Sequence, residues 1–178
     1  MNSKEYKKFI NELYGSGSID DIQKAILLWG AERNLIDFNL DNELAMLNEE
    51  LDEYLEADFD DNNYLKLDAL CDIYVVYTQT EVKAMFNDLD KELNNQALKH
   101  FKLVYKLIPN TITAMGYDFN KCMEEVLKEI SSRRQDPKQQ EDWEKHGVPK
   151  GAKWQKDREQ CSETLYKADF SNCLLKDK

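Results

Sequence analysis

Two consecutive segments with different helical patterns most constrain how this chain folds. In the first, leucines recur at the spacing of one helix face, at Leu40, Leu44, Leu47, Leu51 and Leu55. The second segment, residues 64–77, is apolar almost all round, which is typical of a helix buried on every side. A polar, turn-prone link at residues 58–63 joins them. The pattern therefore predicts two antiparallel helices, the second of them in the core.

Acidic residues occur in both predicted helices at helical spacing. Glu50 and Glu53 fall side by side on one flank of the leucine stripe, and Asp68 and Asp72 lie one turn apart in the apolar segment. A carboxylate in a buried helix is costly unless a cation or an ion pair compensates its charge. Four such carboxylates facing one another would form an all-oxygen site suited to Mg²⁺, with Mn²⁺ as a substitute.

Two less specific interpretations of these acids stay open. The chain has 35 acidic residues, and a glutamate-rich helix face is more often solvated than metal-binding. An ion pair with Lys66 or Lys83 would also compensate a buried Asp68 or Asp72. The position of the two aspartates inside an apolar run favours the cation, because exposed acids do not usually interrupt such a run.

Glycine and proline are scarce, at 6 and 3 of 178 residues, and together with the long periodic runs this predicts an all-α fold in a single domain. The formal net charge of −11 argues against direct binding of nucleic acid or of an anionic membrane. We find no run long enough to span a membrane, no secretory signal and no Cys-x-x-Cys spacing, so we expect reduced thiols in a cytoplasmic protein. An acidic chain that binds a phosphate substrate needs metal ions to reverse the local sign of the charge.

The remaining segments predict further helices. Residues 1–14 form a short amphipathic helix, and Ser18 is expected to cap a second helix that runs to about Leu35. A charged amphipathic helix follows at about residues 83–107, and Pro109 is expected to end it. A closing helix begins near Asp118.

An aromatic residue and two lysines are candidate contacts for a phosphate-bearing substrate. Trp29 could stack on a base, although filling the core is the more common role of a tryptophan, and nearby Arg33 is expected to be a solvated surface charge. Lys153 and Lys156 belong to a charged segment, residues 135–160, that also contains glycine and proline. This segment is either a loop that closes over a phosphate or a solvated surface segment.

The order of these motifs resembles the MazG-like all-α nucleoside triphosphate pyrophosphohydrolases, and phage-type members in particular. That superfamily includes the dimeric dUTPases and phosphoribosyl-ATP pyrophosphohydrolase. The resemblance is carried by Glu-Glu-Leu-Asp-Glu at 49–53, Asp-Ala-Leu-Cys-Asp-Ile-Tyr-Val-Val at 68–76, the closing-helix sequence at 115–133, Lys-Trp-Gln-Lys-Asp at 153–157 and Tyr-Lys-Ala-Asp-Phe at 166–170. It covers residues 18–80 and 113–170, which is most of the chain.

The resemblance implies a four-helix-bundle catalytic core of the MazG and dimeric dUTPase type. It also implies Mg²⁺-dependent cleavage of a ribo- or deoxyribonucleoside triphosphate to the monophosphate and pyrophosphate. By position, Glu50, Glu53 and Asp72 correspond to metal ligands, and Glu49 to an acid that orients or deprotonates the water. Arg133 stands at the place of a basic phosphate-binding residue.

This chain departs from the pattern of the superfamily at two points. Ala69 stands where many members have glutamate, so Asp68 is expected to take over that role. About 25 residues, at 83–107, are inserted between the third and fourth core helices. By analogy with related folds we expect a homodimer or a homotetramer.

These expectations combine into one hypothesis and two alternatives. The hypothesis is a single domain, residues 1–178, with a core at about 18–134, a helical insertion at about 83–107 and an irregular flap or tail at 135–178. It would control nucleotide pools or remove unwanted nucleotides in a bacterial or phage-infected host cytoplasm. The alternatives are a dUTP-selective hydrolase and a non-catalytic acidic helical binding module, the second of which predicts acids on exposed faces. The candidate residues are Glu49, Glu50 and Glu53 for catalysis, Glu50, Glu53, Asp68 and Asp72 for the metal, and Arg133, Lys153, Lys156 and Trp29 for the substrate.

Overall fold

The computed structural model describes residues 2–132 and 166–175, and in these ranges it contains helices and no strand. The elements in chain order are α1 (Ser3–Gly15), α2 (Asp21–Glu32), α3 (Leu40–Phe59), α4 (Asn63–Phe86), the 3₁₀-helix η1 (Asp90–Asn94), α5 (Gln96–Ala114), α6 (Phe119–Ser132) and the 3₁₀-helix η3 (Phe170–Cys173). The prediction of an all-α fold is therefore confirmed for the described part of the chain.

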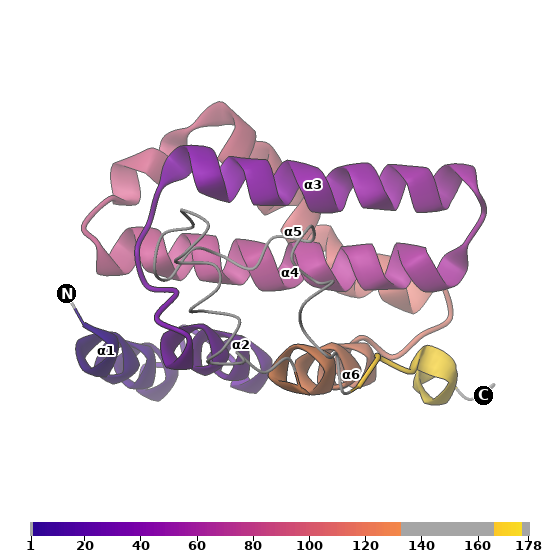
Figure 1. Ribbon diagram of the computed structural model, residues 1–178, viewed down its shortest axis with the longest axis horizontal. Coiled ribbons are helices and arrows are strands. Elements are labelled where there is room, and N and C mark those ends of the chain that lie inside the picture. Colours follow the sequence, from indigo (N-terminus) through magenta and orange to yellow (C-terminus); the bar gives the residue numbers. More distant parts are fainter. Residues whose placement is uncertain (1, 133–165, 176–178) are drawn as a thin grey trace, which may run out of the picture.

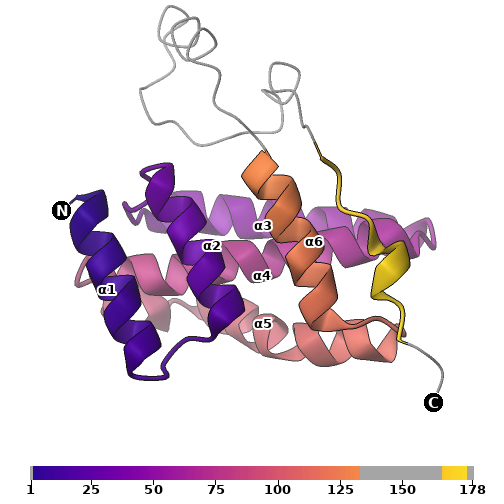
Figure 2. The ribbon, with the colours of Figure 1, turned by 90° about the horizontal axis from the view of Figure 1, so that it is seen from below.

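Helices α3 and α4 form a long antiparallel pair, and the other helices pack around α4 (Figure 1). Helices α1, α2 and α6 run side by side in a second layer that crosses this pair (Figure 2). Helix α5 also packs against α4, so α4 has neighbours on several sides. This central position explains why the sequence of α4 is apolar almost all round.

The core has one large and one small part. The large part surrounds α4 and includes Leu47 of α3, Ile112 of α5 and Met123 of α6. The small part lies where α1 packs on α2 and on the end of α4, around Tyr6 and Val82. The short C-terminal segment 166–175 belongs to the large part, because its Phe170 is only 2% exposed.

The expected cap of α2 at Ser18 is wrong. The helix begins at Asp21 and its N-cap is Asp20, whose carboxylate accepts a hydrogen bond from the backbone N–H of Gln23. The side chain of Gln23 in turn accepts from the backbone N–H of Asp20, which completes a capping box. This arrangement satisfies two backbone donors at the start of the helix, whereas Ser18 lies in the preceding turn.

The expected helix end at Pro109 is also wrong. Pro109 lies inside α5, which continues to Ala114. A proline removes one backbone hydrogen bond from a helix, but the apolar stripe of α5 continues past it and buries Ile108 and Ile112 in the core. The segment 83–107 is therefore divided among the end of α4, η1 and most of α5.

None of the helices in the described ranges is long and apolar enough to cross a membrane.

Candidate functional site

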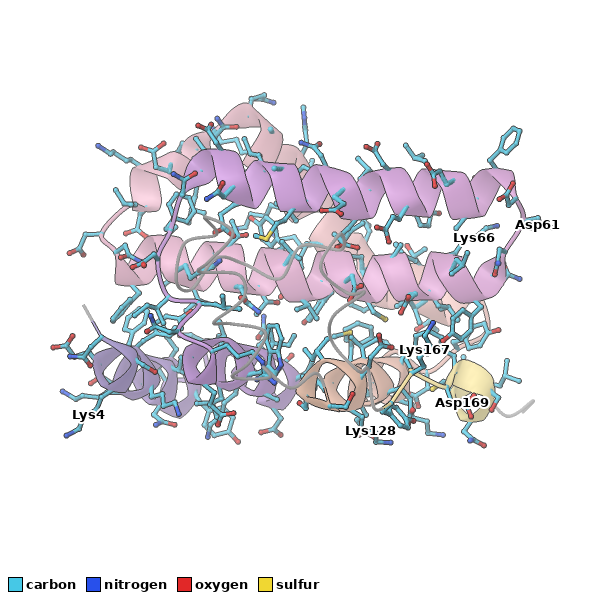
Figure 3. The ribbon with its side chains drawn as sticks, in the orientation of Figure 1. Lys4, Asp61, Lys66, Lys128, Lys167 and Asp169 are labelled. Atoms are coloured by element: carbon cyan, nitrogen blue, oxygen red, sulfur yellow. The ribbon has the colours of Figure 1, made fainter. Side chains whose placement is uncertain are left out.

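Two lysines of α4 form ion pairs with acids near the ends of α3, and these contacts align the two helices. Nζ of Lys83 lies 2.8 Å from Oε1 of Glu43, in the first turn of α3. At the opposite end of the pair, Nζ of Lys66 lies 3.1 Å from Oδ1 of Asp58 and 3.3 Å from Oδ1 of Asp61. Figure 3 shows Lys66 and Asp61 at the turn that joins the two helices. These contacts define the register of α3 against α4.

This register places acids of the two helices at the same level. Counting ten residues inward along each helix from the Glu43–Lys83 pair reaches Glu53 on α3 and residue 73 on α4. Counting five residues inward from the second pair reaches Glu53 and residue 71. Glu53 is therefore level with Asp72 to within about one residue, which is about 1.5 Å along the helix axis.

The helical faces of these acids are consistent with a common site along the line where α3 meets α4. Glu50 follows Glu43 by seven residues and so shares the face that meets α4. Asp72 precedes Lys83 by eleven residues, which is close to three full turns, and so shares the face that meets α3. On α3, Glu53 lies one turn from Glu50, and on α4, Asp68 lies one turn from Asp72. All four are half-buried, and all four already take part in a polar or electrostatic interaction.

Glu49 is the most exposed of the predicted acids. It lies on α3 one turn before Glu53, on the same flank of the helix. This position leaves it open to solvent next to the half-buried acids.

Other carboxylates engage the two lysines that could have compensated Asp68 or Asp72. Lys66 contacts acids at the α3–α4 turn, and Lys83 donates to both oxygens of Glu43. Glu43 was not among the predicted site residues, because its position near the start of a helix is typical of an exposed acid. Only the packing of α4 against α3 shows that this residue is fully buried.

The four acids fit Mg²⁺ in the chemistry of their donor atoms, which are all carboxylate oxygens. In the described ranges, however, no three His, Cys, Asp or Glu side chains are gathered closely enough to hold a metal ion. Binding would therefore require the acids to change rotamer and converge. Along the helix axes, Glu53 and Asp72 share one level, and Glu50 and Asp68 each lie about one turn from that level, on opposite sides of it.

Trp29 has a clear role in packing. Its indole N–H donates to the carbonyl of Ile130 at 2.8 Å, near the C-terminal end of α6. The guanidinium of Arg33 lies over its ring at 4.7 Å and also donates to Ile130. Arg33 is therefore half-buried against Trp29, and the expectation of a solvated surface charge is wrong. Stacking of a base on Trp29 stays a prediction, and such a base would have to share the ring with Arg33.

The C-terminal segment 166–175 is held on α6 by two glutamates that the sequence analysis did not single out. Glu129 accepts from the backbone N–H of Ala168 at 2.8 Å. Glu125 accepts from the N–H of Asp169 and is also hydrogen-bonded by Lys128 and Tyr166, which lower the pKa of its carboxyl group. Figure 3 shows Lys128 and Asp169 at this contact. The spacing of four residues between Glu125 and Glu129 places both on one face of α6, and this spacing is the sequence signal that could have identified them.

Tyr64 connects this segment to the start of α4. Its hydroxyl donates to the carbonyl of Ala168 at 2.6 Å, and its ring contacts Phe170 at a centroid distance of 5.2 Å. Burial, followed by the charges of Asp68 and Glu129, raises the pKa of Tyr64. Glu129 is thus a further acid near the Asp68 end of the predicted site.

Three of the predicted substrate contacts, Arg133, Lys153 and Lys156, lie outside the described residues. Comparisons of the chain with protein-family models, with curated proteins and with solved structures find no match.

Proposed function

We propose that this protein is a Mg²⁺-dependent pyrophosphohydrolase that cleaves a nucleoside triphosphate to the monophosphate and pyrophosphate. The observation that carries the proposal is the register of α3 and α4, which sets Glu53 level with Asp72. Glu50 and Asp68 lie about one turn from this level, one on each side of it. Carboxylates from two facing helices are a suitable oxygen donor set for a hard divalent cation.

The burial of the acids also supports the proposal over a charge-presenting binding module. A module of that kind would display its acids on exposed faces, whereas Asp68 and Asp72 are half-buried on the central helix. Half-buried carboxylates at one level of a helix pair repel one another, so a bound cation would stabilise them.

In this proposal the residues of the chain have distinct roles. Glu50, Glu53, Asp68 and Asp72 hold the metal, which when bound neutralises the triphosphate and lowers the pKa of a coordinated water. Glu49 is exposed next to them and orients or deprotonates the attacking water. The water adds to a phosphorus of the triphosphate, and the bond to the departing pyrophosphate breaks.

The substrate contacts and the assembly belong to the same proposal. Arg133, Lys153 and Lys156 are the proposed partners of the departing phosphates, because their charge offsets the negative charge of pyrophosphate. Trp29 is the proposed partner of the base. The proposal also includes a single domain with its core at about 18–134 and a homodimer or homotetramer in the cytoplasm.

The test is a substrate screen with matched acid variants. Pyrophosphate release is followed for the common ribo- and deoxyribonucleoside triphosphates, dUTP included, with Mg²⁺ or Mn²⁺. We expect Asp72→Asn to lower kcat/KM on the order of 100-fold or more, because a metal site supplies several kcal/mol of transition-state stabilisation. Asp52→Asn is the control, since Asp52 lies on the facing helix α3 next to Glu53, is exposed and has no role in the proposed site, and it should retain wild-type turnover.

Two results would count against the proposal. One is a wild-type protein that releases pyrophosphate from none of these substrates. The other is an Asp72→Asn variant that is as active as the Asp52→Asn control. A preference for dUTP over all other substrates would instead narrow the proposal to the dUTP-selective alternative.

A further inference from the structure

The Glu43–Lys83 ion pair is almost completely shielded from solvent. The exposed fractions of the two side chains are 0% for Glu43 and 2% for Lys83. Nζ of Lys83 lies 2.8 and 2.9 Å from the two carboxylate oxygens, and the hydroxyl of Thr80 donates to the same carboxylate at 2.9 Å. The pair therefore joins α3 to α4 through three short hydrogen bonds in a site without water access.

Helix α1 contributes to this shielding. The rings of Tyr6 and Phe9 contact Phe86 at centroid distances of 4.7 and 5.6 Å, and Phe86 lies one turn beyond Lys83. Burial, followed by the charge of Glu43, raises the pKa of Tyr6, so its hydroxyl is close enough to sense the ion pair. The N-terminal helix thus covers the pair from the side of the smaller core.

Apolar contacts alone specify the register of two helices weakly. The leucine stripe of α3 repeats every three or four residues, so a shift of one turn brings apolar side chains back to equivalent positions. A buried ion pair does not tolerate such a shift, because a displacement of one turn, about 5.4 Å, would leave both charges buried without each other. Buried polar residues fix the register of coiled coils for the same reason.

The other ion pair between the helices is less suited to this role. Asp58 and Asp61 have exposed fractions of 58% and 94%, so solvent screens their attraction to Lys66. Displacing them by one turn would leave both carboxylates in water, and only the Lys66 side chain, which is 12% exposed, would lose a partner in a shielded place. Of the ion pairs between the two helices, Glu43–Lys83 is therefore the one that requires a particular register.

We propose that Glu43 and Lys83 are positioning residues that hold α3 in the one register that sets Glu53 level with Asp72. The pair lies ten residues from Glu53, about 15 Å along the helix, so it acts through the backbone and contacts no substrate. Its effect on the register is independent of what the protein does. Its effect on hydrolysis rests on the proposed function.

The experiment replaces both charges by apolar residues of similar size, as Glu43→Leu with Lys83→Met. Apolar replacements of a buried ion pair often leave a protein as stable as before, so we expect the double variant to fold. Nitroxide labels on cysteines introduced at Ala45 of α3 and Leu65 of α4, which are exposed and lie near opposite ends of the helix pair, report the register in a background where the native cysteines are replaced. Pulsed electron paramagnetic resonance then gives the distance between the labels.

We expect the double variant to show a second or broadened distance, displaced by about 5 Å, because α3 is free to shift by one turn. Its kcat/KM for the best substrate should fall at least about tenfold although its melting temperature is retained. The charge swap, Glu43→Lys with Lys83→Glu, should restore a single distance and part of the turnover. Lys66→Met is the control at the exposed end and should keep the wild-type distance.

A double variant with the single wild-type distance would overturn the inference, and so would one that does not fold, because the pair would then be required for folding itself. The distance measurement decides this without any enzymatic activity. A wild-type protein inactive on every nucleotide would remove the proposed function and leave the inference on the register standing.

Discussion

Tyr6 carries a buried hydroxyl that makes no hydrogen bond with any residue in the described ranges. Its ring is well packed, since it is 1% exposed and contacts Phe86. A buried hydroxyl without a hydrogen bond costs stability, because it has lost its contacts with water and gained none in return. The ring of Tyr6 therefore stabilises the fold, whereas its hydroxyl destabilises it.

We predict that Tyr6→Phe leaves the free energy of unfolding unchanged or raises it by about 1 kcal/mol, because the variant keeps the ring and removes the hydroxyl. The matched control is Tyr64→Phe, which removes a hydroxyl that donates to the carbonyl of Ala168 at 2.6 Å. This control should lose about 1 kcal/mol. Urea denaturation measures both values, and a loss in Tyr6→Phe equal to that in Tyr64→Phe would contradict the prediction.

The contacts of the Trp29 and Arg33 side chains could not be predicted from the residues around them in the sequence. A tryptophan on an apolar helix face is consistent with either core packing or base stacking. Its hydrogen bond to Ile130 and the guanidinium of Arg33 over its ring depend on α6, which lies about 100 residues further along the chain. The pattern around Trp29 contains no information about that contact.

At the scale of the elements, α5 is a helix that contains a proline. Pro109 has no N–H to donate to the carbonyl of Tyr105, yet α5 continues for a further turn. The buried side chains on both sides of the proline, Ile108 and Ile112, hold the helix together across it. Packing in this case outweighs local propensity.

We predict that Pro109→Ala raises the free energy of unfolding by about 1–2 kcal/mol. Restoring the backbone hydrogen bond is worth up to about 3 kcal/mol, and the greater freedom of alanine in the unfolded chain returns about 1 kcal/mol of that gain. Lys106→Ala, at an exposed position of the same helix, is the control and should change stability by less than about 0.5 kcal/mol. Thermal and urea denaturation provide the measurement, and a destabilised Pro109→Ala would show that the proline suits its place in α5.

The C-terminal segment is the element that the sequence pattern describes least well. It contains no periodic apolar run, yet Ala168, Phe170 and Cys173 are buried in the large core. Its backbone is held by carboxylates of α6 and by the hydrogen bond from the N–H of Asp118 to the carbonyl of Cys173 at 2.7 Å. These contacts explain why so short a segment is ordered against the helices.

At the scale of the whole molecule, three buried thiols meet where α4, α6 and η3 pack together. Cys71, Cys122 and Cys173 are free, and each is at most 1% exposed. Burial, and then the nearby thiol of Cys173, raise the pKa of Cys122 from an ordinary value of 9.0 to about 12. The fold therefore keeps this thiol protonated at a pH where the unfolded chain releases the proton.

The higher pKa of Cys122 in the folded protein than in the unfolded chain predicts that the protein loses stability in alkali. Above about pH 9 the unfolded state binds fewer protons than the folded state, so the free energy of unfolding falls as pH rises towards 12. Each such thiol contributes a slope of up to about 1.4 kcal/mol per pH unit. In reducing buffer, Cys122→Ala should therefore show a shallower decline between pH 9 and 10.5 than the wild type.

Val126→Ala is the control for this measurement, because Val126 is also buried on α6 and does not titrate. It should lower stability by the same amount at every pH and leave the slope unchanged. Equal slopes in the wild type and in Cys122→Ala would mean that Cys122 does not contribute to the alkaline loss.

The sequence by itself determined the α3–α4 pair and its inward faces, but not the bounds of α2 and α5. Helical periodicity is a local property, so the leucine stripe of α3 and the apolar run of α4 predicted a long antiparallel pair with α4 at the centre, which the structure confirms. The spacing of Glu50, Glu53, Asp68 and Asp72 likewise predicted which helices carry the candidate metal ligands. The metal and the reaction stay predictions.

Only the tertiary structure decided which side chains meet. Glu43 pairs with Lys83 across 40 residues, and Tyr64 bonds to Ala168 across 104. Contacts at such separations depend on how whole helices pack, and each helix could satisfy its own hydrogen bonds and apolar face in more than one arrangement. The buried Glu43–Lys83 pair favours one of these arrangements over the others, because a buried charge is stable only next to its partner.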